Sequence, residues 1–298
     1  AERNFELYRA CTKDGLLYGG RMYTEYGEPP CAHHTFCHAK ALCDLLNSGF
    51  KYEARVKLPC ESARGVSRFN NGHVLIINKG GWRLTATDCD AVKYRGAAVS
   101  GGALSLVWHD ALGVVFGSSA SQYERVEPMN MQLSQNDPDM PSCTLRIANG
   151  AYQSTNDLEA EMTFEEDSEK ISVRACGKLR NIDFAGSEPY SLEYDIFDDR
   201  LCITASADGG AELLLPVVCG PDEHFTLESE RCLLERGSGA IEIRSDSALY
   251  VRTIGAANGA AEGCARNFSV IGGFGTLPLC ARLTDGESVH IEIRIKAE

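Results

Sequence analysis

The chain lacks the sequence features of several common protein classes. No stretch of its 298 residues approaches the roughly 18 to 20 consecutive apolar residues of a membrane-spanning helix, and Ala1 to Asn4 lack the charged and apolar regions of a signal peptide. A Walker A loop and a G-x-S-x-G turn are also missing. Gly272 to Gly275 is rich in glycine, but it lies among predicted strands, where no helix follows to bind a phosphate. We therefore expect no membrane partner, no cofactor and no serine-hydrolase chemistry.

Positive charge is scarce over the whole chain. It has 29 Lys and Arg against 42 Asp and Glu, a formal net charge of −13, and duplex DNA binding needs a basic surface, so we expect no nucleic-acid partner. Between Lys51 and Arg95, however, nine basic residues stand against four acidic ones. This excess has two explanations: solvated strand faces that happen to be basic, or a cleft for an anionic ligand such as a uronic-acid polysaccharide.

Paired cysteine motifs are missing too. The 13 cysteines are odd in number, they are scattered from Cys11 to Cys280, and no two form a C-x-x-C pair. This pattern indicates neither a zinc ribbon nor a complete set of disulfides. We expect most of them to be reduced and buried, which favours a cytoplasmic location. A secreted or periplasmic protein whose signal peptide has been removed is the alternative.

One helical segment is predicted near the start of the chain. Cys31 to Leu46 follows Pro29-Pro30 and ends at Asn47-Ser48-Gly49, a helix-stop sequence. Its apolar residues recur at helical spacing, which predicts an amphipathic helix with these residues on one face: Phe36, Ala39, Cys43 and Leu46.

From Phe50 onward the periodicity changes to two, which is typical of strands. The turn residues Gly, Asp, Asn and Ser separate well over a dozen such runs, with no long helix between them, so the sequence predicts a mainly β fold built as a large antiparallel sandwich. We divide the chain into a helical segment at 1–49 and a sandwich domain at 50–298. The predicted strands are 51–58, 73–78, 82–87, 103–108, 143–148, 171–176, 191–197, 201–205, 211–218, 240–244, 249–253, 277–283 and 289–296.

Three histidines lie on the predicted helix. His34 and His38 are four residues apart, so their imidazoles share a face and could bind zinc together with Cys31 or Cys37. No Glu completes an H-E-x-x-H pattern, however. One of the three could instead position or protonate a sugar, and simple packing at the junction between helix and sheet is the third interpretation.

Aromatic residues and carboxylates supply further candidates along the strands. Trp108 and His109 end one predicted strand, where they could stack on a sugar or close the edge of the core. Tyr94 lies between Lys93 and Arg95, and two such cations would lower the pKa of its phenol if they surround it. Asp88 or Asp90 could act as one carboxylate of a glycosidase.

Three runs of this sequence resemble the heparinase II/III-like group of carbohydrate-active proteins. They are DGLLYGGRMYTEYGEPPCAHHTFCHAKAL from Asp14 to Leu42, WRLTATDCDAVKYRG from Trp82 to Gly96, and GGALSLVWHDALG from Gly101 to Gly113. The resemblance implies an antiparallel β super-sandwich from residue 50 to residue 298. It also implies that the helical segment is the end of a toroid-like domain, of which most is missing, so this chain would be the C-terminal portion of a larger unit.

The resemblance further implies a polysaccharide lyase, in which a Tyr and His pair abstracts a proton from a uronate and protonates the leaving oxygen. It nominates as catalytic Tyr23, His33, His34, Tyr94 and His109, and as substrate-binding Trp82, Arg83, Lys93, Arg95 and Trp108. No metal is expected. The predicted function is β-elimination on an acidic polysaccharide or oligosaccharide. The alternatives are a glycoside hydrolase on the same scaffold and a non-catalytic sandwich that binds a glycan or supports a larger enzyme.

Overall fold

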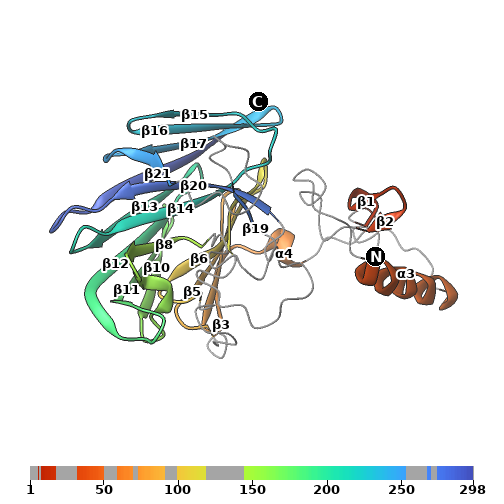
Figure 1. Ribbon diagram of the computed structural model, residues 1–298, viewed down its shortest axis with the longest axis horizontal. Helices are drawn as coiled ribbons and strands as arrows, with labels where there is room; N and C mark the ends of the chain where they lie inside the picture. The colour runs from red at the N-terminus through yellow and green to blue at the C-terminus, as the bar shows by residue number, and fades with distance from the viewer. Residues whose placement is uncertain are drawn as a thin grey trace.

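Antiparallel strands make up most of the structure, a computed structural model (Figure 1). It describes residues 6, 8–17, 32–49, 59–69, 73–90, 99–118, 144–252, 267–269 and 274–297. Beside the sandwich lie the helix α3 (Ala32–Asn47) and the two-stranded hairpin of β1 (Thr12–Lys13) and β2 (Leu16–Leu17). The Thr35 hydroxyl receives a hydrogen bond from the Leu17 amide at 3.0 Å, which ties the hairpin to the helix.

Eight strands pair side by side to form what we call the first sheet. All of its pairings are antiparallel, and it is the layer of the sandwich farther from α3 (Figure 1). In spatial order its strands are β10 (Glu161–Glu166), β11 (Ile171–Arg180), β12 (Gly186–Ile196), β13 (Arg200–Ala207), β21 (Val289–Lys296), β17 (Gly239–Ser245), β16 (Arg231–Arg236) and β15 (Phe225–Glu228).

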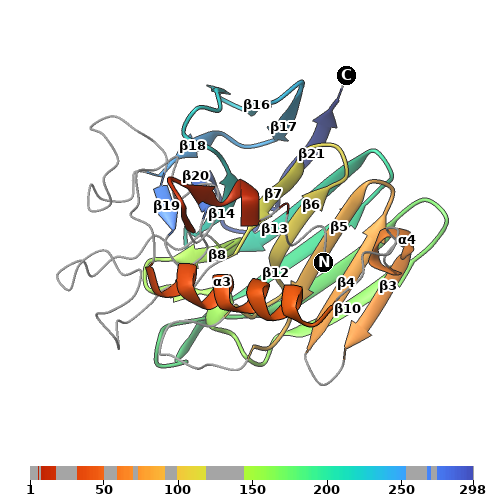
Figure 2. The ribbon, with the colours of Figure 1, turned by 90° about the vertical axis from the view of Figure 1, so that its right-hand side faces the viewer.

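The remaining layer, the second sheet, faces the side on which α3 lies (Figures 1 and 2). A short strand, β9 (Tyr152–Gln153), pairs with both sheets through β8 and β11. The order of the second sheet is β3 (Gly65–Phe69), β4 (Val74–Lys79), β5 (Trp82–Thr87), β6 (Ala103–His109), β7 (Gly113–Gly117), β14 (Glu212–Val218) and β20 (Phe274–Arg282), with β8 (Arg146–Asn149) on β14, and β18 (Leu249–Val251) and β19 (Asn267–Ser269) on β20.

The core lies between the two sheets because alternate residues of each strand point inward. On β13 the buried positions are Leu201, Ile203, Ala205 and Ala207, while the residues between them are partly exposed. Two buried tyrosines of β12 add polar contacts across the core. The hydroxyl of Tyr190 donates a hydrogen bond to the carbonyl of Gly101 at 3.0 Å, and that of Tyr194 donates one to Gly102 at 2.8 Å.

The predicted fold class is confirmed, and period-two apolar runs located most strands. The runs 82–87 and 289–296 coincide with β5 and β21 at both ends. Nine of the described strands were not predicted: β1, β2, β3, β7, β9, β10, β15, β16 and β19. Of these, β3 and β10 are mostly exposed and carry only two apolar side chains each. The predicted strand at 51–58 lies outside the described residues.

Helix α3 begins and ends one residue later than the predicted 31–46. The apolar residues that share one face of this helix are exposed: Phe36, Ala39, Cys43 and Leu46. Phe36 and Leu46 have 76% and 72% of their surface accessible. The helical spacing therefore predicted the helix but not a surface that covers it.

Two expectations about the whole chain can be compared with the described part. No helix among those residues is long and apolar enough to span a membrane. Of the nine cysteines whose side chains the structure describes, four are buried, namely Cys11, Cys219, Cys232 and Cys280. The others are partly or fully exposed, so burial explains fewer of the cysteines than the sequence analysis expected.

Gly102 provides a test of the contact between the sheets. Its φ is +78°, and a Cβ there would lie 2.1 Å from the Cβ of Ala175 on the first sheet. Gly210 has a similar φ of +73° but nothing within 4 Å of a Cβ. We expect Gly210→Ala to lower the free energy of unfolding by about 1 to 2 kcal/mol through backbone strain alone. Gly102→Ala should cost about 1 to 3 kcal/mol more because the sheets must separate. Urea denaturation measures both, and equal losses would contradict this account of the packing.

Candidate functional site

Trp82 belongs to the core. It begins β5, its side chain has no accessible surface, and it lies opposite His109 of β6. The two rings meet edge to face, with their centroids 4.7 Å apart. A fully buried indole cannot stack on a sugar, so the prediction that Trp82 binds substrate was wrong. The strand alternation that places Leu84 and Ala86 in the core places Trp82 there as well.

The contacts of His109 are those of a packed side chain. Its ring lies against Trp82, its Nδ1 receives a hydrogen bond from the Ala111 amide at 3.2 Å, and its Nε2 would lie 2.6 Å from a Cβ at Gly81. Burial lowers the pKa of the imidazole; Asp110 opposes this shift, and Arg83 adds to it. These contacts favour the interpretation that His109 closes the edge of the core. Its catalytic role stays a prediction that no contact of the described residues supports.

Arg83 and Trp108 lie on the other face of the same two strands. They are opposite each other in the register of β5 and β6, and both are partly exposed. The guanidinium of Arg83 donates to the backbone oxygen of Trp82 at 2.9 Å and to Asp110 at 3.3 Å, which fixes its position beside the indole. A planar cation next to an aromatic face can contact both the acidic group and the apolar face of a sugar.

This outer face of the second sheet is partly apolar. Phe69, Ile76 and Leu106 are exposed on β3, β4 and β6, with accessible fractions of 55%, 38% and 38%. The register places Ile76 opposite Ser67 and Leu106 opposite Thr85, so polar and apolar side chains share this face. The face lies on the side of the sandwich where α3 is found (Figure 2). It therefore offers the surface expected of a sugar-binding site, with apolar area and a few fixed polar groups.

A histidine that the sequence analysis did not consider lies at the opposite end of β4 and β5. Nδ1 of His73 is 3.0 Å from Oδ1 of Asp88. The amide of Asp88 also donates to the carbonyl of His73 at 3.2 Å, so backbone and side chain link the same two residues. The side chain of His73 is 54% exposed, whereas that of Asp88 is only 8% exposed.

The backbone of His73 adopts an uncommon conformation. Its φ is +49°, in the left-handed region that residues other than glycine seldom occupy. Such strain persists only where surrounding contacts maintain it, and it is enriched at functional sites. A nearly buried carboxylate close to one imidazole nitrogen of a half-exposed histidine is an arrangement suited to proton transfer. The sequence contains a signal for this pair: His73 lies at the start of one predicted strand, Asp88 follows the next, and a short turn joins the two strands.

Several predicted residues cannot be compared with the structure. Tyr23, Lys93, Tyr94 and Arg95 lie outside the described residues. His33 and His34 belong to α3, but their side chains are not among those described. Their roles stay predictions. Of the side chains that the structure does describe, no three His, Cys, Asp or Glu gather as ligands for a metal ion.

Comparisons with known proteins identify the family. The family model described as the ulvan lyase C-terminal domain matches residues 66–297, and that of the ulvan lyase N-terminal domain matches residues 1–61. The chain belongs to the ulvan lyase family. Its match to the broad-specificity ulvan lyase of Formosa agariphila is 29% identical over 302 residues. That match covers 94% of this chain but only 45% of the relative, so the chain spans less than half of the relative's length.

The fold of this ulvan lyase family member is also found among solved structures. Two structures of heparinase III match it with a TM-score of 0.55 each, at 7% and 10% sequence identity. The matches cover 97% and 96% of this chain and 43% of heparinase III. They confirm the predicted resemblance to the heparinase II/III-like group and the super-sandwich architecture. The predicted division after residue 49 stays a prediction.

The two tryptophans provide a matched test of the corrected placement. Trp82→Ala removes a side chain without accessible surface and should lower the free energy of unfolding by about 3 to 5 kcal/mol. Trp108→Ala removes the same side chain from the outer face and should cost about 1 kcal/mol. Urea denaturation of both variants checks this difference. Similar losses would show that Trp108 is as much part of the core as Trp82.

The pKa of His109 leads to a prediction about pH. Because this pKa is lowered in the folded protein from its ordinary value of 6.5, the unfolded chain binds the proton more readily. The stabilisation is complete above that value and is lost as the pH falls through it toward the folded pKa. We expect the difference in unfolding free energy between the native protein and His109→Gln to shrink between about pH 8 and about pH 5.5. A constant difference across this range would contradict the lowered pKa.

Proposed function

We propose that this protein is a polysaccharide lyase that cleaves an acidic polysaccharide of the ulvan type by β-elimination. Membership of the ulvan lyase family and the named activity of the Formosa agariphila relative support this proposal. Among the described residues, the observation that carries it is the pair formed by His73 and Asp88, which is the arrangement best suited to proton transfer.

The chemistry needs a base, a cation and an acid. The base removes the proton next to the uronate carboxyl group, the electron pair of that C–H bond forms a double bond in the ring, and the bond to the leaving oxygen breaks. A proton is then delivered to that oxygen. In our proposal, the Asp88 carboxylate, whose Oδ1 lies 3.0 Å from Nδ1 of His73, orients the ring so that Nε2 accepts the first proton. The buried carboxylate then stabilises the imidazolium that forms.

Candidate partners follow Asp88 closely in the sequence. The nearest ones, five to seven residues later, are Lys93, Tyr94 and Arg95. A fully extended chain of seven residues spans about 25 Å, so none of the three can lie farther than this from the backbone of Asp88. We propose Lys93 or Arg95 as the cation that neutralises the uronate carboxylate, and Tyr94 as the acid that protonates the leaving oxygen.

Arg83 and Trp108 serve a different part of the substrate in this proposal. Arg83 precedes Asp88 by five residues along an extended strand, which separates them by about 17 Å. This distance is too large for both residues to contact the sugar that reacts. We assign Arg83 and Trp108 to a neighbouring sugar of the same polymer, which crosses the outer face of the second sheet.

Variants of His73 test this assignment. Asparagine tolerates the left-handed backbone that position 73 requires, so His73→Asn removes the imidazole with little added strain. We expect kcat/KM on ulvan to fall by about 100-fold or more, because the general base is lost. Asp88→Asn should lower kcat and shift the pH dependence of the reaction. His224→Asn, at an exposed position on the first-sheet side, is the matched control and should retain full activity.

The assay follows ulvan cleavage by the ultraviolet absorbance of the unsaturated product and by new reducing ends. An increase in both signals supports a lyase. Reducing ends without absorbance would show hydrolysis and overturn the proposal. Binding of ulvan without either signal would show a glycan-binding protein instead. Full activity of His73→Asn would leave the lyase intact but remove His73 from its mechanism.

A further inference from the structure

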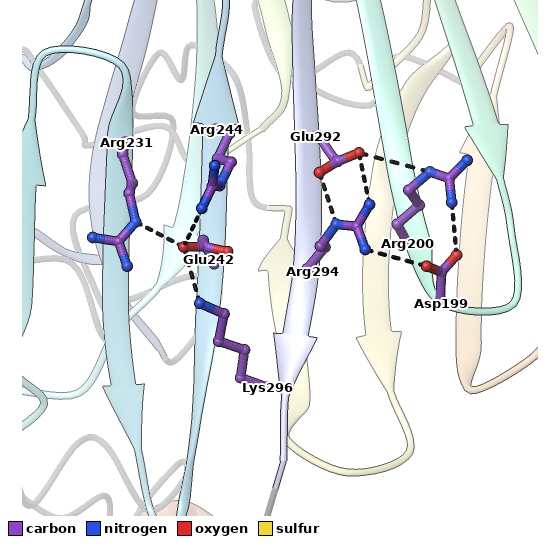
Figure 3. Close-up of polar contacts among 8 residues, drawn as sticks. All are labelled: Asp199, Arg200, Arg231, Glu242, Arg244, Glu292, Arg294 and Lys296. Carbon is purple, nitrogen blue, oxygen red and sulfur yellow. Dashed lines mark hydrogen bonds and ion pairs between the residues drawn. The ribbon is translucent and has the colours of Figure 1, made fainter.

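A row of arginines crosses the outer face of the first sheet. Four neighbouring strands contribute one residue each: Arg231 from β16, Arg244 from β17, Arg294 from β21 and Arg200 from β13 (Figure 3). The register places Arg231 directly opposite Arg244 and Arg294 directly opposite Arg200. We call these four residues, with Lys296 at the end of β21, the arginine row.

The register of these strands pairs like charges as well as unlike ones. Arg231 with Arg244 and Arg294 with Arg200 are like-charged pairs, which are destabilising. Arg244 also lies opposite Glu292, however, and Arg294 opposite Glu242, which are favourable pairs. The protein as a whole carries a formal charge of −13, so a gathering of cations opposes its overall charge. Carboxylates on the same face neutralise part of the row and hold its cations in place.

Glu242 lies beneath one half of the row. Its side chain is 3% exposed, and its Oε1 receives hydrogen bonds from Arg231 Nε at 2.7 Å and Arg244 Nη2 at 3.3 Å, with Lys296 Nζ at 3.0 Å (Figure 3). Burial by itself raises the pKa of this carboxyl group, but the bonds from the three cations outweigh it and lower the pKa to about 2. Glu242 is therefore ionised and holds the three cations around it.

The other half of the row is arranged in a similar way. Glu292 accepts two hydrogen bonds from Arg294, at 2.7 and 3.2 Å, and lies 3.7 Å from Arg200. Asp199 contacts Arg200 at 3.0 Å and Arg294 at 3.3 Å. With Glu228, which is 3.6 Å from Arg231, four carboxylates are paired with five cations. The most buried of these carboxylates is Glu242, whereas Arg244 and Lys296 are 59% and 52% exposed. Asp199 and Glu228 are each 58% exposed as well, so both signs of charge reach the surface, with one cation more than there are carboxylates.

A hollow of about 490 Å³ lies at the β16 end of the row. Arginine, serine and glutamate side chains surround it, so it offers donors for an acidic group as well as acceptors and hydroxyls for sugar hydroxyls. The lining residues are Glu228, Ser229, Glu230, Arg231, Arg244 and Ser245.

We propose that the arginine row and this hollow form a second binding site for an acidic polysaccharide, on the sheet that does not carry His73 and Asp88. Strands are about 4.8 Å apart, so four arginines on adjacent strands extend over about 14 Å, which suits a polymer with repeated acidic groups. Guanidinium groups bind sulfate and carboxylate oxygens through paired hydrogen bonds. Only the choice of ligand rests on the proposed function. The site holds the polymer while another segment of it is cleaved.

Dextran sulfate is the probe that tests this site, with neutral dextran as its control. It carries no uronate, so β-elimination cannot consume it, and the result does not depend on whether the protein is a lyase. We expect affinity electrophoresis to show that Arg244→Gln/Arg294→Gln binds dextran sulfate about 10-fold more weakly than the native protein. The matched control is Arg174→Gln/Lys178→Gln, which removes the same charge from exposed positions on β11 of the same sheet and should bind as the native protein does.

Glu242→Gln should change the affinity for dextran sulfate in the opposite direction. It removes a negative charge from beneath the row, so it should tighten dextran sulfate binding while it lowers the free energy of unfolding. A purely structural network would lower stability without any gain in binding. Equal weakening by the two double variants, or unchanged binding by Arg244→Gln/Arg294→Gln, would overturn the proposal. If that variant does not fold, Lys296→Gln, at a half-exposed position, should weaken binding about threefold, and unchanged binding would overturn the proposal in the same way.

Discussion

The hydrogen bonds from Tyr190 and Tyr194 to the turn at Gly101 and Gly102 are the contact on which the candidate site depends. They connect the first sheet to the second at the end of β5, through hydroxyl groups that are buried in the core. Burial raises the pKa of both phenols, so each remains a donor. The turn is closely packed, because a Cβ at Gly102 would overlap Ala175.

The same turn fixes the position of the carboxylate. The Gly101 amide donates to the carbonyl of Asp88 at 3.0 Å, and the Gly102 amide donates to that of Thr87 at 2.8 Å. Asp88 in turn donates its amide to His73. A continuous series of contacts therefore runs from the core tyrosines through the glycine turn to the imidazole. This series explains how a histidine at the end of a strand keeps a strained backbone and a fixed ring position.

Periodicity predicted the elements of this fold better than it predicted their surroundings. The run 82–87 predicted β5 correctly. Alternation alone did not tell which face of the strand is buried, and Trp82 was assigned to the exposed face although its side chain is buried. The helix 32–47 was predicted from its spacing, although its apolar stripe is exposed. His73 could have been found, since the β4–β5 hairpin places it opposite Asp88. The arginine row could not, because its members come from segments as distant as Arg200 and Lys296 and meet only through the strand order.

One physical arrangement recurs in both sheets. At the end of β5, the nearly buried carboxylate of Asp88 holds an imidazole that is half exposed; on β17, the nearly buried Glu242 holds three cations, of which two are more than half exposed. In each case the carboxylate loses solvation when it is buried and recovers stability only through its partners, so those partners are held in place. Their outward atoms stay available to a ligand. In this acidic protein, nearly buried carboxylates thus fix the histidine and arginine groups from which the two proposed sites are built.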